Sequence, residues 1–143
     1  MSLEVQGRVM AIDLGEKRIG VAVSDPTRTV AKAYGVLRRK SRREDFDRYA
    51  HIIAEQQVTL LVMGLPVPLS GVEGDRAAWV RDYTAELQQR LDIPVVFWDE
   101  ALSTQRAEES LRARGAGRKQ AKQRLDAVAA AFILQDYLDA HAA

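Results

Sequence analysis

The sequence has no cysteine and no long hydrophobic run, and these absences exclude several classes of protein. Because none of the 143 residues is cysteine, disulfides, thiolate metal sites and cysteine nucleophiles are excluded. This composition fits a reducing compartment, so we expect a cytoplasmic protein. There is no apolar run of about 18 residues or more, which predicts no membrane span. No charged segment followed by an apolar one opens the chain, so we expect no secretory signal.

The chain also lacks a large net charge, but its charges are unevenly distributed. The 21 basic and 20 acidic residues give a net charge of +1. Segment 38–48 holds six basic and three acidic residues, and segment 106–124 holds seven basic and two acidic residues. Two local basic segments on a nearly neutral chain suit an anionic partner such as nucleic acid. Ordinary solvated surface segments would have the same composition.

The apolar pattern predicts strands in the first part of the chain. Segments 8–14 and 18–24 flank a tight turn that contains glycine, as in a β-hairpin. Segment 29–37 is a weaker third strand. Two short apolar runs, 58–63 and 94–98, are typical of strands buried on both faces.

Helical spacing of apolar residues predicts the remaining elements. We expect a helix over 42–57, with Ser41 at its N-cap, and a second helix around residues 80–91. Further helices are expected from Ser103 or Thr104 to about residue 113 and over 122–139, separated by a glycine-containing loop. The order predicts an α/β domain over residues 1–143 with a mixed five-stranded sheet. The first three strands are expected to be antiparallel, followed by parallel crossovers, with helices on the flanks.

Three carboxylates stand at places where chemistry collects in such sheets, although each has an ordinary explanation. Asp13 ends the first strand and could form an Asx-turn. Glu100 follows the last strand and could be a surface residue. Asp126 could interact favourably with the N-terminal dipole of the last helix. Together, three carboxylates can hold one or two Mg²⁺ or Mn²⁺ ions, but periodicity alone does not single out these three.

A resemblance does single them out. The segments DLGEKRIGVAVSD, MGLPVPLSGVEGDRA, WDEALSTQRAE and LDAVAAAFILQDYL occupy positions 13–25, 63–77, 98–108 and 125–138. In this order they resemble the four signature segments of the YqgF family, also called RuvX or the pre-16S rRNA nucleases. The family was earlier described as Holliday-junction resolvases. The resemblance extends over nearly the whole chain.

The resemblance implies a ribonuclease H-like fold and a metal-dependent nuclease site. From the length of the chain we expect one domain, and we expect it to act as a monomer or homodimer. The acidic positions of the family match Asp13, Glu100 and Asp126, which are therefore the expected catalytic residues and ligands of Mg²⁺ or Mn²⁺. Ala101 stands where the family usually has an arginine, a departure that affects substrate positioning. The residues expected to bind substrate phosphates are Lys17, Arg18, Arg114, Arg118, Lys119 and Lys122.

The expected partner is structured nucleic acid. The name of the family favours precursor 16S rRNA, processed at its 5′ end during ribosome biogenesis. A branched DNA junction is the alternative substrate. A second alternative is a non-catalytic RNA-binding factor in ribosome assembly, although such a surface gains nothing from clustered acids. The turn after Asp13 is also similar to the phosphate-binding hairpin of actin-like ATPases, which need a second lobe to enclose nucleotide.

Overall fold

The computed structural model describes residues 7–67, 70–100 and 118–142, and for residues 118–126 the backbone alone. Its elements are β1 (Arg8–Leu14), β2 (Arg18–Ser24), β3 (Ala31–Arg38), α1 (Arg42–Gln56), β4 (Val58–Leu65), α2 (Asp75–Gln88), β5 (Val95–Asp99) and α4 (Arg118–Ala140). The predicted helix over 103–113 lies outside the described residues.

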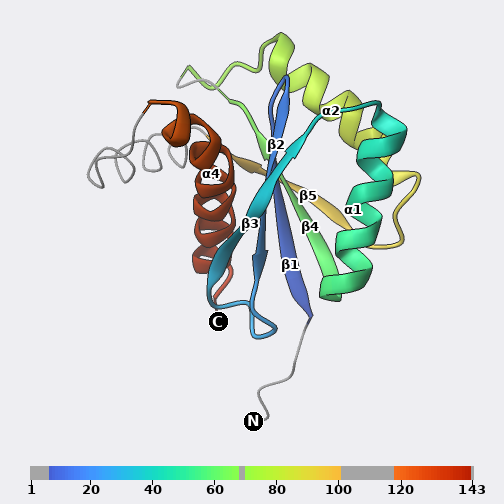
Figure 1. The fold of residues 1–143 in the computed structure, drawn as a ribbon, viewed down its shortest axis with the longest axis vertical. Helices are drawn as coiled ribbons and strands as arrows, with labels where there is room; N and C mark the ends of the chain where they lie inside the picture. The colour runs from blue at the N-terminus through green and yellow to red at the C-terminus, as the bar shows by residue number, and fades with distance from the viewer. Residues whose placement is uncertain (1–6, 68–69, 101–117, 143) are drawn as a thin grey trace.

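The strands form one mixed sheet in the order β3-β2-β1-β4-β5 (Figure 1). β1 pairs antiparallel with β2, and β2 pairs antiparallel with β3. β4 lies parallel to β1, and β5 lies parallel to β4. The sequence prediction of an antiparallel start followed by parallel crossovers is confirmed, and the first two strands have the predicted bounds.

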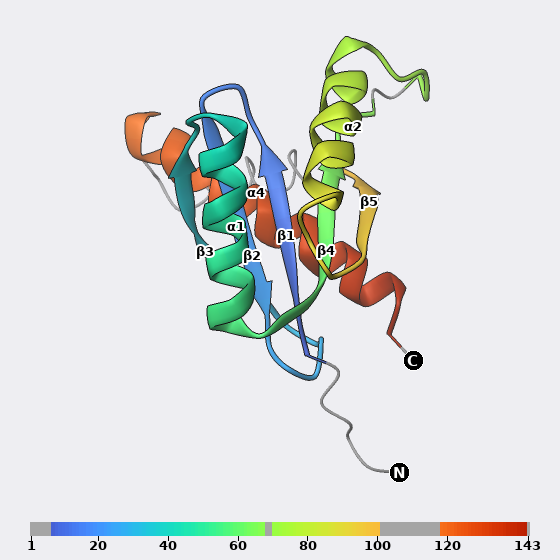
Figure 2. The ribbon, with the colours of Figure 1, turned by 90° about the vertical axis from the view of Figure 1, so that its right-hand side faces the viewer.

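Helices cover both faces of this sheet. α1 and α2 lie on one face, and α4 crosses the other (Figures 1 and 2). Successive residues of a strand point to opposite faces, so β1 contributes to two cores. Met10 and Ile12 pack toward α1 and α2, whereas Val9 and Ala11 pack toward α4. From Val9 to Ile12, β1 is therefore apolar on both sides, and Asp13 ends this run.

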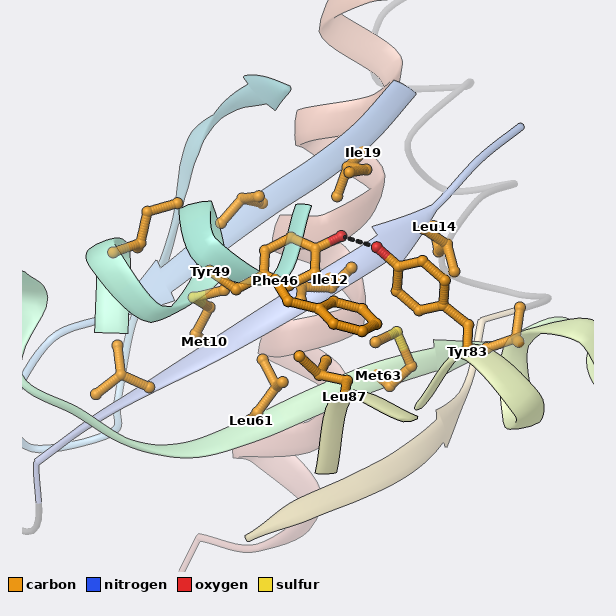
Figure 3. Packing of buried hydrophobic residues seen from close by; sticks show 14 of the residues in the cluster. Met10, Ile12, Leu14, Ile19, Phe46, Tyr49, Leu61, Met63, Tyr83 and Leu87 are labelled. Carbon is orange, nitrogen blue, oxygen red and sulfur yellow. Dashed lines mark hydrogen bonds between the residues drawn. The ribbon is translucent and has the colours of Figure 1, made fainter. Parts of the chain in front are cut away.

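The larger core lies beneath α1 and α2 and contains a buried polar group. The hydroxyls of Tyr49 and Tyr83 are 2.8 Å apart (Figure 3). Tyr83 donates to the fully buried carboxylate of Asp45, which also pairs with Arg48 at 2.6 Å. This network joins the first turn of α1 to α2, because each buried polar atom needs a partner.

Several predicted boundaries differ from those of the structure, among them the start of α2 at Asp75 and the end of β4 at Leu65, and two of the differences have a clear local reason. The third strand begins at Ala31 rather than residue 29, because the amides of Thr29 and Val30 both donate to the carboxylate of Asp25. The last helix begins at Arg118 rather than residue 122, since the intervening Arg, Lys, Gln and Ala are good helix formers. The N-cap of α1 at Ser41 is confirmed, with the side chain accepting from the amide of Glu44. None of the helices among the described residues is long and apolar enough to span a membrane.

Candidate active site

Asp13 is the polar residue that interrupts the apolar α4 face of β1. It pairs across the hairpin with Gly20, while its neighbours Ile12 and Leu14 are buried in the core on the opposite face. The turn after Asp13 is closed by a hydrogen bond of 2.8 Å from the amide of Gly15 to the carbonyl of Arg18. The hairpin therefore holds Asp13 at the end of the central strand.

Glu100 follows β5, the edge strand on the other side of β1 from the hairpin, and its carboxyl group lies next to Asp13. Its amide donates to the carbonyl of Leu65 at 3.2 Å, which extends the β4–β5 ladder by one residue past β5. This backbone position brings its carboxyl group to Asp13, with which it forms a hydrogen bond. Although Glu100 is only half-buried as a residue, its Oε2 atom is buried. This atom has no hydrogen-bond partner within the described part of the chain.

The surroundings of Glu100 disfavour its charged form. Burial, followed by the negative charge of Asp13 and the hydrogen bond to it, raises the pKa of Glu100 from 4.5 to about 9. Two carboxyl groups at one site cannot both ionise easily unless a cation joins them. Without such a cation, Glu100 is protonated at neutral pH, and its O–H group donates a hydrogen bond to the carboxylate of Asp13.

Gly64 in β4 lies between the two acidic strand ends. A Cβ atom at this position would lie 2.6 Å from Glu100 Oε2 and 3.0 Å from Ile133 Cδ1 of α4. It would also lie 3.3 Å from the carbonyl oxygen of Ile12, the residue before Asp13. The absence of a side chain at this position therefore makes room for the carboxyl group. This role of Gly64 was not predicted from the sequence, although a glycine at the end of an apolar strand indicates a close approach of another group.

Arg76 is a second residue of the site that was not among the site residues predicted from the sequence. It belongs to the first turn of α2, and its Nη2 atom donates to the carbonyl of Leu14 at 2.8 Å. Its positive charge lowers the pKa of Glu100, opposing the effect of Asp13. The guanidinium also lies 5.8 Å from the ring centre of Trp79. No sequence pattern predicted this contact, because it depends on how α2 packs over the hairpin.

The remaining predicted site residues are described only in part. Lys17 is exposed in the hairpin turn, and Arg18 begins β2 beside it. The backbone places Arg118, Lys119, Lys122 and Asp126 in α4. The side chains of those four residues, and the whole of Arg114, lie outside the described structure. Neither the third carboxylate of the predicted triad nor the cations around it are therefore placed.

The described residues at the site fit a divalent cation. A buried carboxylate oxygen without a partner and a second carboxylate beside it are the oxygen ligands that Mg²⁺ and Mn²⁺ prefer. Among the side chains that the structure describes, no group of three His, Cys, Asp or Glu residues could hold a metal ion. Asp13 and Glu100 would therefore need at least one ligand from elsewhere, such as Asp126, water or substrate.

The fold is ribonuclease H-like, as its relation to solved structures shows. The structure of "T. thermophilus RuvC in complex with Holliday junction substrate" is similar, with a TM-score of 0.59 and 17% identity over 94% of this chain and 95% of that one. The fowlpox virus resolvase has a TM-score of 0.55 and 10% identity, covering 95% of this chain and 99% of that one. At such low identities the similarity shows the fold alone.

Sequence comparison defines the family more narrowly. Residues 7–140 match the family RuvX, described as "Holliday junction resolvase". A protein of Syntrophomonas wolfei is 42% identical over 132 residues, covering 92% of this chain and 94% of that protein. A Roseiflexus protein is 44% identical over 133 residues, covering 93% of this chain and 94% of that protein. Both are named "Putative pre-16S rRNA nuclease". The chain belongs to the RuvX family, which confirms the resemblance seen in the sequence.

Proposed function

We propose that this protein is a metal-dependent nuclease that hydrolyses phosphodiester bonds in structured nucleic acid. We further propose that it trims the 5′ end of precursor 16S rRNA in the cytoplasm. The main support is the pair formed by Asp13 and Glu100, with one buried carboxylate oxygen left without a partner in the described part of the chain. Membership of a family whose relatives carry a nuclease name supports the same reaction class.

Asp13 and Glu100, with Asp126 from α4, are the proposed ligands of the metal. A bound Mg²⁺ or Mn²⁺, or two such ions, would supply an activated water and stabilise negative charge on the phosphate. Glu100 must lose its proton for this role, because the ligand is the carboxylate. Arg76 aids that loss, since its charge already favours the ionised form of Glu100.

The proposed substrate contacts come from cations around the acids. Lys17 lies in the turn after β1, and Arg18 begins β2. The first turns of α4 lie at the same end of the sheet as this hairpin turn (Figure 1). They contain Arg118, Lys119 and Lys122. Arg114 belongs to the same basic segment of the sequence. These side chains would hold the nucleic-acid backbone through its phosphates, with an affinity that falls as salt rises.

A second candidate substrate is a branched DNA junction, favoured by the description of the family as a Holliday junction resolvase. A cleavage assay with Mn²⁺ tests both candidates side by side on structured precursor rRNA and a four-way DNA junction. Faster cleavage of the RNA is the expected result. Preferential cleavage of the junction would replace the proposed substrate, and cleavage of neither would contradict the nuclease assignment.

A further inference from the structure

Some cations of the basic segment 38–48 form ion pairs within the described structure, and others do not. Arg39 and Arg48 pair with the buried carboxylate of Asp45, and Arg42 pairs with two acids of α2. Three cations of the segment, and one from the neighbouring hairpin turn, are exposed and have no side-chain partner among the described residues. They are Arg38, Lys40, Arg43 and Lys17. The fold therefore does not account for the charge of this second group.

Strand register places Arg38 on the same face of the sheet as Asp13. Asp13 lies opposite Gly20 on β2, and Arg18, two residues earlier on that strand, shares the face of Gly20. Arg18 in turn lies opposite Arg38 on β3. The intervening Ile19 and its partner Leu37 pack into the core on the opposite face. From β1 to β3, this end of the sheet therefore presents Asp13, Arg18 and Arg38 in sequence.

Two arginines directly opposite each other concentrate positive charge where a phosphate could lie. Guanidinium groups bind phosphate oxygens through parallel N–H donors. With strands about 4.8 Å apart and a rise of about 3.3 Å per residue, the backbone of Arg38 lies roughly 12 Å from that of Asp13. A nucleic-acid strand whose scissile phosphate lies at Asp13 would place another phosphate, a few nucleotides away, at this pair.

The backbone around Arg38 is firmly held, as a binding position requires. Arg48 Nη2 donates to the carbonyl of Arg38 at 2.7 Å. The same nitrogen also donates to the carboxylate of Asp45 at 2.6 Å, which holds the guanidinium in position. The amide of Arg39 donates to the carbonyl of Lys17 at 2.8 Å, which joins the end of β3 to the hairpin turn. These contacts fix the backbone from which the Arg38 side chain extends, so binding does not have to order that part of the chain.

We propose that Arg18 and Arg38, together with the nearby residues Lys17 and Lys40 of the hairpin turn and of the loop after β3, form a phosphate-binding subsite for the nucleic-acid backbone on the β3 side of the acids. This inference rests on the proposed function, because it assigns the path of the substrate strand. The subsite adds β3 and the loop that follows it to the surface that binds substrate. The substrate contacts proposed above come only from the hairpin and from the basic segment that includes the start of α4.

The test compares Arg38→Gln with Lys32→Gln, which removes an exposed cation at the opposite end of the same strand. Binding of a fluorescent RNA hairpin with a single-stranded tail is measured without divalent metal over a series of salt concentrations. Arg38→Gln should weaken binding several-fold and reduce the slope of log K against log[salt] by about 0.7–0.9, the value for one lost phosphate contact. Arg38→Lys should restore the slope, and Lys32→Gln should leave it unchanged. Equal effects of Arg38→Gln and Lys32→Gln would overturn the subsite.

A parallel cleavage assay with Mn²⁺ separates this inference from the proposed function. Cleavage by the unmodified protein, together with equal binding by the Arg38→Gln and Lys32→Gln variants, would overturn the subsite alone. Arg38-dependent binding without cleavage of RNA or DNA would support the subsite and overturn the nuclease. Thermal unfolding of each variant shows whether the fold is kept, as expected for an exposed side chain without a partner in the described structure.

Discussion

The carboxyl group of Glu100 occupies the space that a side chain at Gly64 would fill. A Cβ atom at Gly64 would lie 2.6 Å from Glu100 Oε2, closer than real Cβ atoms approach another atom. Gly64→Ala should therefore displace the carboxyl group from Asp13 and lower the affinity for Mn²⁺ by about 10-fold or more. Crowding against Ile133 and the Ile12 carbonyl should also lower the free energy of unfolding by about 1–3 kcal/mol.

Gly35 in β3 provides a matched control for this substitution. A Cβ atom there would have no other atom within 4 Å, so Gly35→Ala should keep both Mn²⁺ affinity and stability. Calorimetric titration with Mn²⁺ and urea unfolding measure the two effects. Unchanged Mn²⁺ affinity in Gly64→Ala would show that the position of Glu100 is unimportant for the metal.

The raised pKa of Glu100 predicts how stability depends on pH in the metal-free protein. The folded state holds this proton up to about pH 9, whereas the unfolded chain releases it near 4.5. This group therefore stabilises the fold below about pH 4.5, and the contribution is lost as pH rises toward 9. A difference of one pH unit between the folded and unfolded pKa corresponds to about 1.4 kcal/mol. The stability lost over this range should therefore exceed about 1 kcal/mol.

Glu100→Gln removes this titration and keeps a similar shape. Urea unfolding with a chelator at pH 5 and pH 9 should show a smaller loss of stability in the variant than in the unmodified protein. Mn²⁺ should protect the unmodified protein at pH 9, because it binds the ionised carboxylate. Parallel stability curves for the two proteins would mean that Glu100 titrates normally.

Arg76 should influence the reaction through Glu100. Its charge lowers the pKa of that carboxyl group, so Arg76→Gln should move the pH at which Mn²⁺ begins to bind to a higher value. Arg81→Gln is the control, because Arg81 lies in the same helix and pairs with Glu73 at 2.7 Å. Mn²⁺ titrations between pH 6 and 9 measure the change. The same pH dependence in both variants would make Arg76 a residue of the fold only.

Asp25 illustrates an acid that serves the fold. Its carboxylate accepts from the amides of Thr27, Thr29 and Val30 and from the Thr27 hydroxyl. These hydrogen bonds hold the pKa of Asp25 well below its usual range, with the Thr27 hydroxyl as the largest cause. The resulting stability is present above about pH 4 and is lost as pH falls through the lowered pKa.

Asp25→Asn should therefore destabilise the protein at pH 7, by about 1–2 kcal/mol for lost charge-assisted hydrogen bonds, and weaken its acid dependence. Mn²⁺-dependent cleavage should persist, because Asp25 stands at the end of β2 remote from the end of β1. Urea unfolding at pH 3 and pH 7 provides the measurement. Equal stability of both proteins at pH 7 would contradict the role of the turn.

The strands and helices were largely predictable because their signals are local. Hydrophobic period, Ser41 as a cap and the hairpin glycine each act within a few residues. Asp13 and Glu100 were identified by resemblance to a family, since each has an ordinary explanation when considered alone. Gly64 and Arg76 were missed because their roles depend on distances between segments far apart in the sequence. Arg38 carries its charge in a visible run, but only strand register places it on the face of Asp13.

The most direct test of the account is the Mn²⁺-dependent cleavage rate of structured precursor RNA by the Asp13→Asn variant. Asp47→Asn, which alters an exposed acid of α1, is measured beside it. Loss of even an outer-shell partner of a metal ligand costs about 10–100-fold, so Asp13→Asn should lose more than about 100-fold while remaining folded. Asp47→Asn should match the unmodified protein. Full activity in folded Asp13→Asn would contradict the assignment of the acids as the catalytic centre.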